Sequence, residues 1–377
     1  MNLVGREGRT LAASRRVVVK IGSALLVEEG KGTIRSSWLE AFAADVAALR
    51  ARGQEVLIVT SGAVAVGRRS LRFGHRALRL AEKQAAAATG MVQLAQAYQE
   101  ALDRHGLTVA LVLLTLDDSE HRRRYINARN TLTTLLGMGA LPLINENDTV
   151  ATDEIRFGDN DRLSARVAAM VSADMLVLLS DIDGLYTGDP HKDPNATLIP
   201  EVRDITPQIE ASAGAALPGY GTGGMVTKLA AAKIAIAAGC GMVIADGKPL
   251  HALQRVDQGG PCTWFMPSAS PQTARKRWIG GSLKPSGALT VDEGAARALA
   301  AGGSLLPAGV VRVDGVFSRG DAVVVKTHDG RELGRGLCAY SADEIRLIMG
   351  HKSAEIDACL GYRGRDEVIH RDDLVLG

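Results

Sequence analysis

The sequence predicts an α/β fold: an open, mostly parallel sheet sandwiched by helices, followed by a small β-rich domain at the C-terminus. Over the first two thirds of the 377 residues, short apolar runs rich in β-branched residues alternate with longer Ala- and Leu-rich segments. Beyond about residue 285, strand signals and Asp-Gly turns dominate. Strands that alternate with helices form parallel sheets with helices on both faces, whereas strands joined by tight turns form antiparallel ones.

Six short apolar runs are the predicted strands of the main sheet. They are continuous rather than alternating, as expected of strands buried on both faces. They are Val17–Ile21, Val56–Thr60, Val109–Thr115, Leu141–Asn145, Met175–Leu179 and Met242–Ala245. Segments with helical character lie between them, at Ser37–Arg52, Leu80–His105, Tyr125–Met138, Arg162–Val171 and Thr227–Ala238. Aromatic residues make up 4% of the chain, so Ala, Val, Leu and Ile must build the core.

A stretch with several Pro, Gly and Ser residues divides the chain. We predict an N-terminal tail over 1–14, an α/β domain over 15–266, a linker over 267–285, a β-rich domain over 286–366 and a tail over 367–377. In the β-rich domain, a helix near Glu293–Ala301 precedes strands at Val310–Val313 and Ala322–Thr327, and Asp329-Gly330 predicts a hairpin turn. The basic Arg275–Arg277 stretch is interpreted as part of a solvated linker.

Composition and charge exclude several classes of protein. A net charge of +2 is not that of a dedicated nucleic-acid binder. The four cysteines are too few for a disulfide scaffold and too widely spaced for a CxxC site, so we expect a cytoplasmic protein without a metal cluster. The longest apolar stretches, such as Leu107–Leu116, are too short to span a bilayer, so no membrane partner is expected.

Polar residues stand at the carboxyl ends of four of the predicted strands. They are Lys20 at the end of the first, Thr60-Ser61-Gly62 at the second, Asn145–Asp148 at the fourth and Ser180-Asp181 at the fifth. Each group alone is also explained as a turn or a helix cap. Because ligands of open α/β sheets bind beyond the carboxyl ends of the strands, four such ends together favour a binding site.

Two Gly-containing segments each precede a predicted helix. Gly158–Asp161 comes before the helix at Arg162, and Gly219–Lys228 opens a later one. The second fits GxGxxG, but no strand signal precedes it, which argues against a dinucleotide fold, and no Walker A motif occurs. Main-chain N–H groups at such a helix start bind anions, so we predict a phosphate site of another kind.

The inventory of candidate residues suits phosphoryl transfer. Lys20 and Lys228 can stabilise the negative charge on the transferring group, together with Mg²⁺ and main-chain N–H groups. A carboxylate acceptor is already an anionic nucleophile, so a catalytic histidine is not needed.

Ten sequence blocks, in this order, resemble the glutamate 5-kinase family of the amino-acid kinase superfamily, which carries a C-terminal PUA domain. The resemblance spans about residues 15 to 370 and implies the amino-acid kinase fold, with an eight-stranded, mostly parallel sheet. In the first domain the blocks are VVVKIGSALL (17–26), VTSGAVAVGR (59–68), INENDTVAT (144–152), FGDNDRLSA (157–165), LLSDIDGLYTGDP (178–190) and GTGGMVTKL (221–229). In the second they are LTVDEGA (289–295), GSLLPAGV (303–310), FSRGD (317–321) and EIDACLGYRG (355–364).

The resemblance implies a reaction in which ATP and L-glutamate give L-glutamyl 5-phosphate, the first step of proline biosynthesis. It implies that Lys20 and Lys228 are catalytic, and that Asp161 orients both lysines. It implies that glutamate binds at Ser61, Asp148 and Asn160. Asp148 would then pair with the α-ammonium group, while Ser61 and Asn160 would donate hydrogen bonds to carboxylate oxygens.

For the nucleotide, the resemblance implies ATP with Mg²⁺. The matching positions are Lys20, Ser180, Asp181, Thr222, Gly223, Gly224, Met225, Val226, Thr227 and Lys228. Ser180 stands where many relatives have Thr, which keeps the hydroxyl. The resemblance also implies inhibition by proline and a homo-oligomer, either a tetramer or a dimer.

Two alternatives remain at this point. Another amino-acid kinase, acting on N-acetylglutamate, aspartate, carbamate or UMP, would share most of these motifs, although the NENDTV block and the PUA-like region favour glutamate. An RNA-binding protein is the second, because PUA domains often bind RNA. Residues 286–377 hold 11 Lys plus Arg and 14 Asp plus Glu, a net charge of −3, so nucleic acid is not expected as a partner.

Overall fold

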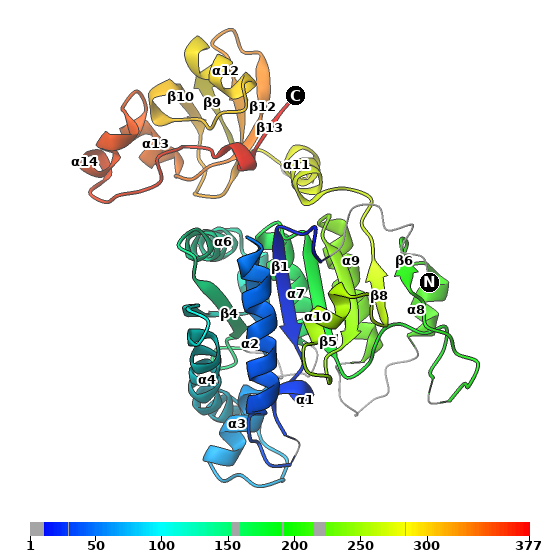
Figure 1. Ribbon diagram of the computed structural model, residues 1–377. Helices are drawn as coiled ribbons and strands as arrows, with labels where there is room; N and C mark the ends of the chain where they lie inside the picture. The colour runs from blue at the N-terminus through cyan, green and yellow to red at the C-terminus, as the bar shows by residue number, and fades with distance from the viewer. Residues whose placement is uncertain (1–10, 29, 152–158, 191, 214–223, 283) are drawn as a thin grey trace. The chain divides into compact units, whose positions relative to one another are not determined.

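The computed structural model describes residues 11–28, 30–151, 159–190, 192–213, 224–282 and 284–377 (Figure 1). The chain forms two compact units. The first runs to Pro271 apart from Arg122–Ile126, and the second contains Arg122–Ile126 together with Gln272–Gly377. Among the described residues, no helix is both long and apolar enough to cross a membrane.

An eight-stranded sheet forms the centre of the first unit, with strand order β3-β4-β2-β1-β5-β7-β8-β6. Neighbouring strands are parallel except β7 and β8, which are antiparallel. The predicted open, mostly parallel sheet is therefore confirmed. The strands are β1 (Arg16–Ile21), β2 (Glu55–Val59), β3 (Val109–Leu114), β4 (Leu141–Glu146), β5 (Met175–Ser180), β6 (Glu201–Val202), β7 (Gly241–Asp246) and β8 (Cys262–Phe265).

Helices cover both faces of this sheet (Figure 1). Helices α2 and α10 pack on one face, whereas α7 and α9 pack on the other. Their bounds are α1 (Ser23–Leu26), α2 (Ser36–Ala51), α3 (Ala63–Ser70), α4 (Leu80–Asp103), α5 (Leu116–Glu120), α6 (Arg122–Gly137), α7 (Asp159–Met170), α8 (Pro207–Ser212), α9 (Met225–Ala237) and α10 (Ala252–Asp257).

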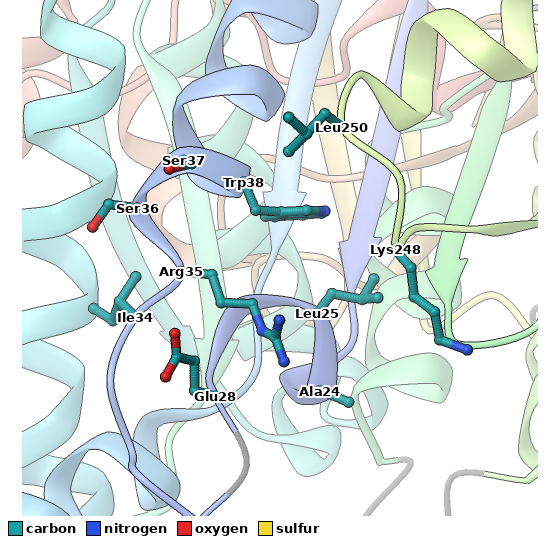
Figure 2. A pocket seen from close by; sticks show the side chains of 10 residues that line it. All are labelled: Ala24, Leu25, Glu28, Ile34, Arg35, Ser36, Ser37, Trp38, Lys248 and Leu250. Atoms are coloured by element: carbon teal, nitrogen blue, oxygen red, sulfur yellow. The ribbon is translucent and has the colours of Figure 1, made fainter.

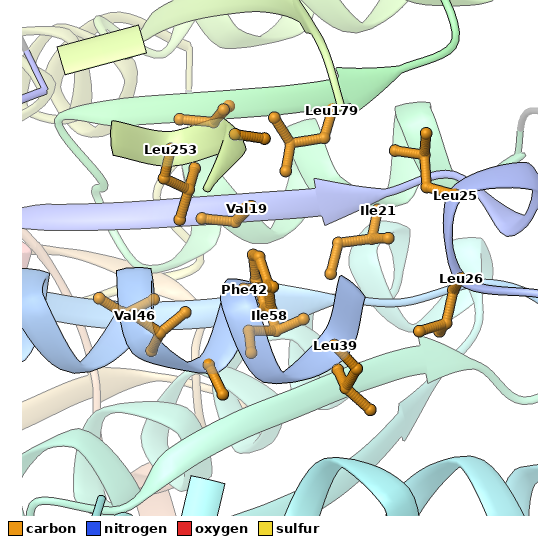
Figure 3. Packing of buried hydrophobic residues seen from close by; sticks show 14 of the residues in the cluster. Val19, Ile21, Leu25, Leu26, Leu39, Phe42, Val46, Ile58, Leu179 and Leu253 are labelled. Carbon is orange, nitrogen blue, oxygen red and sulfur yellow. The ribbon is translucent and has the colours of Figure 1, made fainter. Parts of the chain in front are cut away.

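The side-chain alternation of β1 divides its residues between the two faces. Val19 and Ile21 are fully buried against Phe42 of α2 and Leu253 of α10 (Figure 3). Successive side chains of a strand point to opposite faces, so Lys20 projects to the α7 and α9 side. Burying an aliphatic side chain contributes about 1.5–3 kcal/mol, which fixes this register firmly. The orientation of Lys20 therefore follows from the packing of its apolar neighbours.

Helices α3 and α4 approach each other backbone to backbone. A Cβ atom added at Gly90 would lie 1.9 Å from the Ala63 carbonyl oxygen, and one at Gly67 would lie 1.8 Å from the Ala86 carbonyl oxygen. Glycine is thus required at both positions, because the neighbouring atoms belong to the backbone. The contact fixes the start of α3, which directly follows Ser61 and Gly62.

We expect Gly90→Ala to destabilise the first unit by about 1–3 kcal/mol, because the added methyl group must push α3 away from α4. Urea unfolding followed by circular dichroism measures this loss. Gly137→Ala is the matched control, because a Cβ atom at Gly137 meets nothing within 4 Å. Equal stability of the two variants would contradict the close packing of α3 on α4.

Strand β3 differs from the prediction that all strands are buried on both faces. It lies at the edge of the sheet, where Leu111 and Leu113 are 43% and 39% exposed. The continuous apolar run Val109–Leu114 resembles a central strand, so its sequence alone suggested burial. An edge position leaves one long side of the strand without a neighbour in this chain.

The second unit is built on a five-stranded sheet with order β10-β9-β11-β12-β13. Strands β11 and β12 are antiparallel around Asp329-Gly330, with Gly330 at a φ of +86°, so the predicted hairpin is confirmed. The strands are β9 (Gly287–Val291), β10 (Val310–Gly315), β11 (Ala322–Lys326), β12 (Glu332–Leu337) and β13 (Leu374–Leu376). The helices are α11 (Pro271–Ser282), α12 (Glu293–Ala300), α13 (Ala342–Ile348) and α14 (Ile356–Leu360), with 3₁₀ turns at Pro307–Gly309, Ser353–Glu355 and Arg371–Asp373.

Two segments at the predicted boundaries have more structure than expected. The predicted linker contains helix α11, and Arg275, interpreted as solvated, has a side chain only 8% exposed that pairs with Asp373. The predicted tail after residue 366 includes β13, which pairs with β12. Both differences depend on contacts between remote segments, and the local composition of either segment does not reveal them.

Candidate active site

Asp161 lies between two lysine side chains at the carboxyl end of the main sheet. Its Oδ1 atom is 2.6 Å from Nζ of Lys20, and its Oδ2 atom is 3.2 Å from Nζ of Lys228. The Thr227 hydroxyl donates to the same Oδ2 atom over 2.9 Å. Asp161 is fully buried, and both lysines are nearly so. The structure thus brings the three predicted catalytic residues together.

Three separate elements supply these side chains. Lys20 is the penultimate residue of β1, Asp161 lies in the first turn of α7, and Lys228 lies in the first turn of α9. The Ser164 hydroxyl donates to the Asp161 carbonyl oxygen over 2.7 Å, which closes the first turn of α7. The helix dipole favours a carboxylate at the start of α7 and disfavours a cation at the start of α9. Asp161 therefore offsets the unfavourable position of Lys228.

Burial and charge act together on the pKa values of this cluster. Burial lowers the pKa of Lys20, and the Lys228 ammonium lowers it further, while Asp161 opposes both effects. Burial alone would raise the pKa of Asp161, but the ammonium groups of Lys20 and Lys228 outweigh it, so the pKa lies below its ordinary value. The carboxylate is therefore charged at neutral pH. Two cations around one anion leave a positive site that attracts phosphate.

Asn160, next to Asp161, joins the ends of two strands, β2 and β4. Its Nδ2 atom donates to the Thr60 carbonyl oxygen and to Ser61 Oγ, both over 2.8 Å, and lies 3.2 Å from Asn145 Oδ1. A carbonyl oxygen can only accept, so this contact fixes the orientation of the amide. The N–H groups thus bind protein oxygens here, although we expected them to face a substrate carboxylate. The Oδ1 atom is buried without a hydrogen-bond partner among the described residues.

The other predicted substrate and nucleotide residues lie at the same sheet edge. Asp148 is buried just after β4. Ser180 ends β5, and its hydroxyl donates to Asp181 Oδ1 over 3.0 Å. Asp181 is exposed. Its negative charge raises the pKa of Lys20, in opposition to burial, so the Asp181 carboxylate lies near the Lys20 ammonium. The polar ends of β1, β2, β4 and β5 thus form one edge.

Helix α9 begins with Gly224 as its N-cap, without a side-chain hydrogen bond to the first turn. The first-turn N–H groups of Met225 and Val226 are therefore available to an anion, whereas the Thr227 N–H donates to the Gly224 carbonyl oxygen over 3.1 Å. Thr222 and Gly223, predicted to belong to the same loop, lie outside the described residues. Within the described ranges there is no group of three or more His, Cys, Asp or Glu side chains that could hold a metal ion.

Comparisons with known proteins agree with this geometry. The sequence model of the amino acid kinase family matches residues 15–246, and that of the PUA domain matches residues 287–360. A glutamate 5-kinase of Paramagnetospirillum magneticum is 65% identical over 97% of this chain and 99% of its own, and that of Rhodospirillum rubrum is 63% identical over 95% and 96%. The chain belongs to the glutamate 5-kinase family. A solved carbamate kinase from Giardia lamblia bound to AMP-PNP, with a TM-score of 0.50 and 15% identity, covers 68% of this chain and 100% of its own, and shows the shared fold.

In this member of the glutamate 5-kinase family, two residues that the sequence analysis did not single out contact predicted parts of the site. The buried Tyr98 hydroxyl lies 3.0 Å from Thr60 Oγ1, beneath the Ser61 end of β2. Burial raises the pKa of Tyr98, so its hydroxyl stays protonated. The other is Lys248, whose Nζ atom donates to the Asp181 carbonyl oxygen over 2.7 Å. Tyr98 lies within an apolar helix pattern without a distinguishing signal, whereas Lys248 could have been found because it follows a strand end.

Proposed function

We propose that the chain transfers the terminal phosphoryl group of ATP to the side-chain carboxylate of L-glutamate. The product is L-glutamyl 5-phosphate, and the reaction is the first step of proline biosynthesis. The single observation that carries this proposal is the buried Lys20–Asp161–Lys228 cluster, with its two ammonium groups on one carboxylate. The relatives named glutamate 5-kinase, similar over nearly the whole chain, supply the identity of the acceptor.

Each residue of the cluster has a defined part in the transfer. Lys20 and Lys228 stabilise the negative charge that spreads over the oxygens of the transferring group. Asp161 opposes the lowering of the Lys20 pKa by burial, and it holds both ammonium groups at fixed positions. The glutamate carboxylate attacks as an anion, so no side chain has to remove a proton. Catalysis is then mainly positioning and electrostatic stabilisation.

The glutamate site is formed by Asp148, Ser61 and Asn160. Asp148 pairs with the α-ammonium group of the substrate, and the Ser61 hydroxyl, which accepts from Asn160, donates its hydrogen to a substrate carboxylate oxygen. In the described arrangement the buried Oδ1 atom of Asn160 is suited to accept a hydrogen bond from the α-ammonium group. Asn160 would thus accept a hydrogen bond from the substrate, whereas the sequence analysis expected it to donate one to a substrate carboxylate.

The nucleotide is proposed to be ATP with Mg²⁺. The uncapped start of α9, together with Lys20 and Lys228, fits a polyphosphate. Mg²⁺ usually binds substrate phosphates together with one or two carboxylates, so it needs no cluster of protein ligands. When bound, it supplies charge neutralisation on the phosphate oxygens.

The remaining expectations of location, regulation and assembly are proposals as well. We infer a cytoplasmic enzyme, inhibited by proline and assembled as a dimer or tetramer, with no nucleic-acid partner. The exposed Leu111 and Leu113 on edge strand β3 support an oligomer, because an apolar edge strand tends to be covered. The net charge of −3 over residues 286–377 supports the absence of a nucleic-acid partner.

Trapping of the product with hydroxylamine tests the proposed reaction. An acyl phosphate reacts with hydroxylamine to give a hydroxamate, so glutamate, ATP and Mg²⁺ together should yield glutamyl hydroxamate. Aspartate, N-acetylglutamate, carbamate and UMP are tested as alternative acceptors. The rate of ADP release measures the reaction with each of them. Hydroxamate formation that requires both glutamate and ATP supports the proposal. Faster ADP release with another acceptor would refute it.

Asp148→Asn is expected to raise the KM for glutamate about 10- to 100-fold, because the α-ammonium group loses its charge partner, a loss of roughly 1.5–3 kcal/mol. The KM for ATP serves as the internal control and should change by less than about twofold. Steady-state kinetics with each substrate varied in turn measures both values. A rise confined to the KM for ATP would contradict the assignment of Asp148 to the glutamate site.

A further inference from the structure

The turn that follows β7 holds the segment that follows β5. The Gly247 N–H group donates to the Ser180 carbonyl oxygen over 2.8 Å, which extends the β5–β7 pairing by one step. One residue further, the Lys248 ammonium donates to the Asp181 carbonyl oxygen over 2.7 Å. Ser180 and Asp181 are the proposed nucleotide contacts. Two neighbouring residues of one turn, Gly247 and Lys248, thus donate hydrogen bonds to their carbonyl oxygens.

This turn is itself firmly anchored. The Trp38 indole N–H donates to the Gly247 carbonyl oxygen over 2.6 Å, and the Lys248 N–H donates to Asp246 Oδ1 over 2.9 Å. A Cβ atom at Gly247 would lie 2.3 Å from Leu25 Cδ1 and 3.0 Å from Leu179 Cβ, so a side chain there would displace the buried Leu25. The base of the Lys248 side chain is therefore fixed, and the ammonium reaches Asp181 from a rigid support.

The Lys248 side chain also lines a cavity of about 560 Å³, together with Arg35, Trp38 and Leu250. Figure 2 shows its ammonium pointing away from Arg35 and Trp38. The ammonium is directed at the main chain of Asp181 and not at these neighbours. Asp181 in turn acts electrostatically on Lys20, so the backbone that Lys248 holds carries a charge next to the catalytic cluster.

We propose that Lys248 is a positioning residue for the nucleotide. Its ammonium fixes the Asp181 main chain, so that Ser180 and Asp181 keep the arrangement in which they contact bound ATP. This rests on the proposed function, which places ATP at these two residues. Lys248 acts through the Asp181 backbone and not by touching the phosphates, so loss of its ammonium should weaken nucleotide binding and leave glutamate binding unchanged.

Isothermal titration of the full-length protein with ATP and MgCl₂ tests this. We expect Lys248→Met to weaken ATP binding about tenfold, and Lys248→Arg, which keeps a charged donor, to stay within about threefold of the wild type. In kinetics, the KM for ATP should rise about tenfold in Lys248→Met, with the KM for glutamate within about twofold. Lys233→Met is the matched control, because the exposed Lys233 ammonium pairs with Glu210 on another part of the unit.

Three results would overturn the proposal. One is ATP affinity in Lys248→Met equal to that of the wild type. The second is an equal rise of both KM values, which marks a general disturbance of the fold. The third is a loss of ATP affinity in Lys248→Met that is seen at about 0.05 M salt but not at about 0.5 M. Salt screens the attraction between exposed charges, so this result would show that Lys248 attracts the phosphates directly. If the wild type binds ATP but forms no glutamyl hydroxamate, the proposed reaction fails, while the ATP titrations still decide the role of Lys248.

Discussion

Replacing Lys228 by methionine is expected to lower kcat about 10²–10³-fold, the usual effect of removing one preorganised group that stabilises transition-state charge. Methionine keeps most of the aliphatic stem, so the packing of the buried side chain changes little. The ammonium sits 3.2 Å from Asp161 Oδ2 in a site shielded from water, where a charge acts strongly. Because charge develops mainly during transfer, kcat should fall far more than the KM for ATP rises.

Lys20→Met should behave in the same way, since Lys20 binds the other oxygen of the same carboxylate. Lys233→Met, on the same helix as Lys228 but paired with Glu210 at the surface, is the control and should keep wild-type kcat. Steady-state rates under saturating glutamate and ATP measure the effect. Activity of Lys228→Met within a few-fold of the wild type would show that Lys228 is merely a buried structural lysine.

Asp161→Asn is expected to reduce kcat by at least as much as either lysine change, about 10²–10³-fold. Asparagine has nearly the same shape but no charge, so the two ammonium groups lose the anion that holds them together. Asp161 raises the pKa of Lys20, whereas burial and Lys228 lower it. Removal of the carboxylate should therefore lower the pKa of Lys20 further. The residual activity should then be lost at a lower pH than in the wild type as the pH rises.

Double variants test whether the three residues act as one unit. The loss of kcat in Asp161→Asn with Lys228→Met should be much smaller than the product of the two single losses, because both changes disable the same group. Asp161→Asn combined with Lys233→Met is the control pair and should show the simple product. A simple product in both pairs would contradict a shared role of Asp161 and Lys228.

Much of the fold was predicted from local patterns. Continuous apolar runs located β1, β2, β4, β5 and β7, because a strand buried on both faces needs apolar side chains at every position. The predicted helix at Leu80–His105 became α4, at Leu80–Asp103. Short elements such as α3 and β6 escaped prediction, since a few residues carry too little periodicity. Strand β3 and helix α11 were misjudged because exposure and ordering depend on what lies beside them.

The candidate site, too, was predicted only in part from the sequence. Because the ends of parallel strands meet at one sheet edge, the sequence by itself placed Lys20, Ser61, Asp148 and Asp181 in one region, and its motifs indicated phosphoryl transfer. The tertiary structure decided which atoms meet: Asp161 lies 67 residues from Lys228 in the sequence, yet its carboxylate contacts the ammonium groups of both lysines. It also decided the orientation of the Asn160 amide and the contact of the Lys248 ammonium with the Asp181 carbonyl oxygen. Such contacts depend on strand order and on the faces that apolar packing selects, and no local stretch of sequence encodes either.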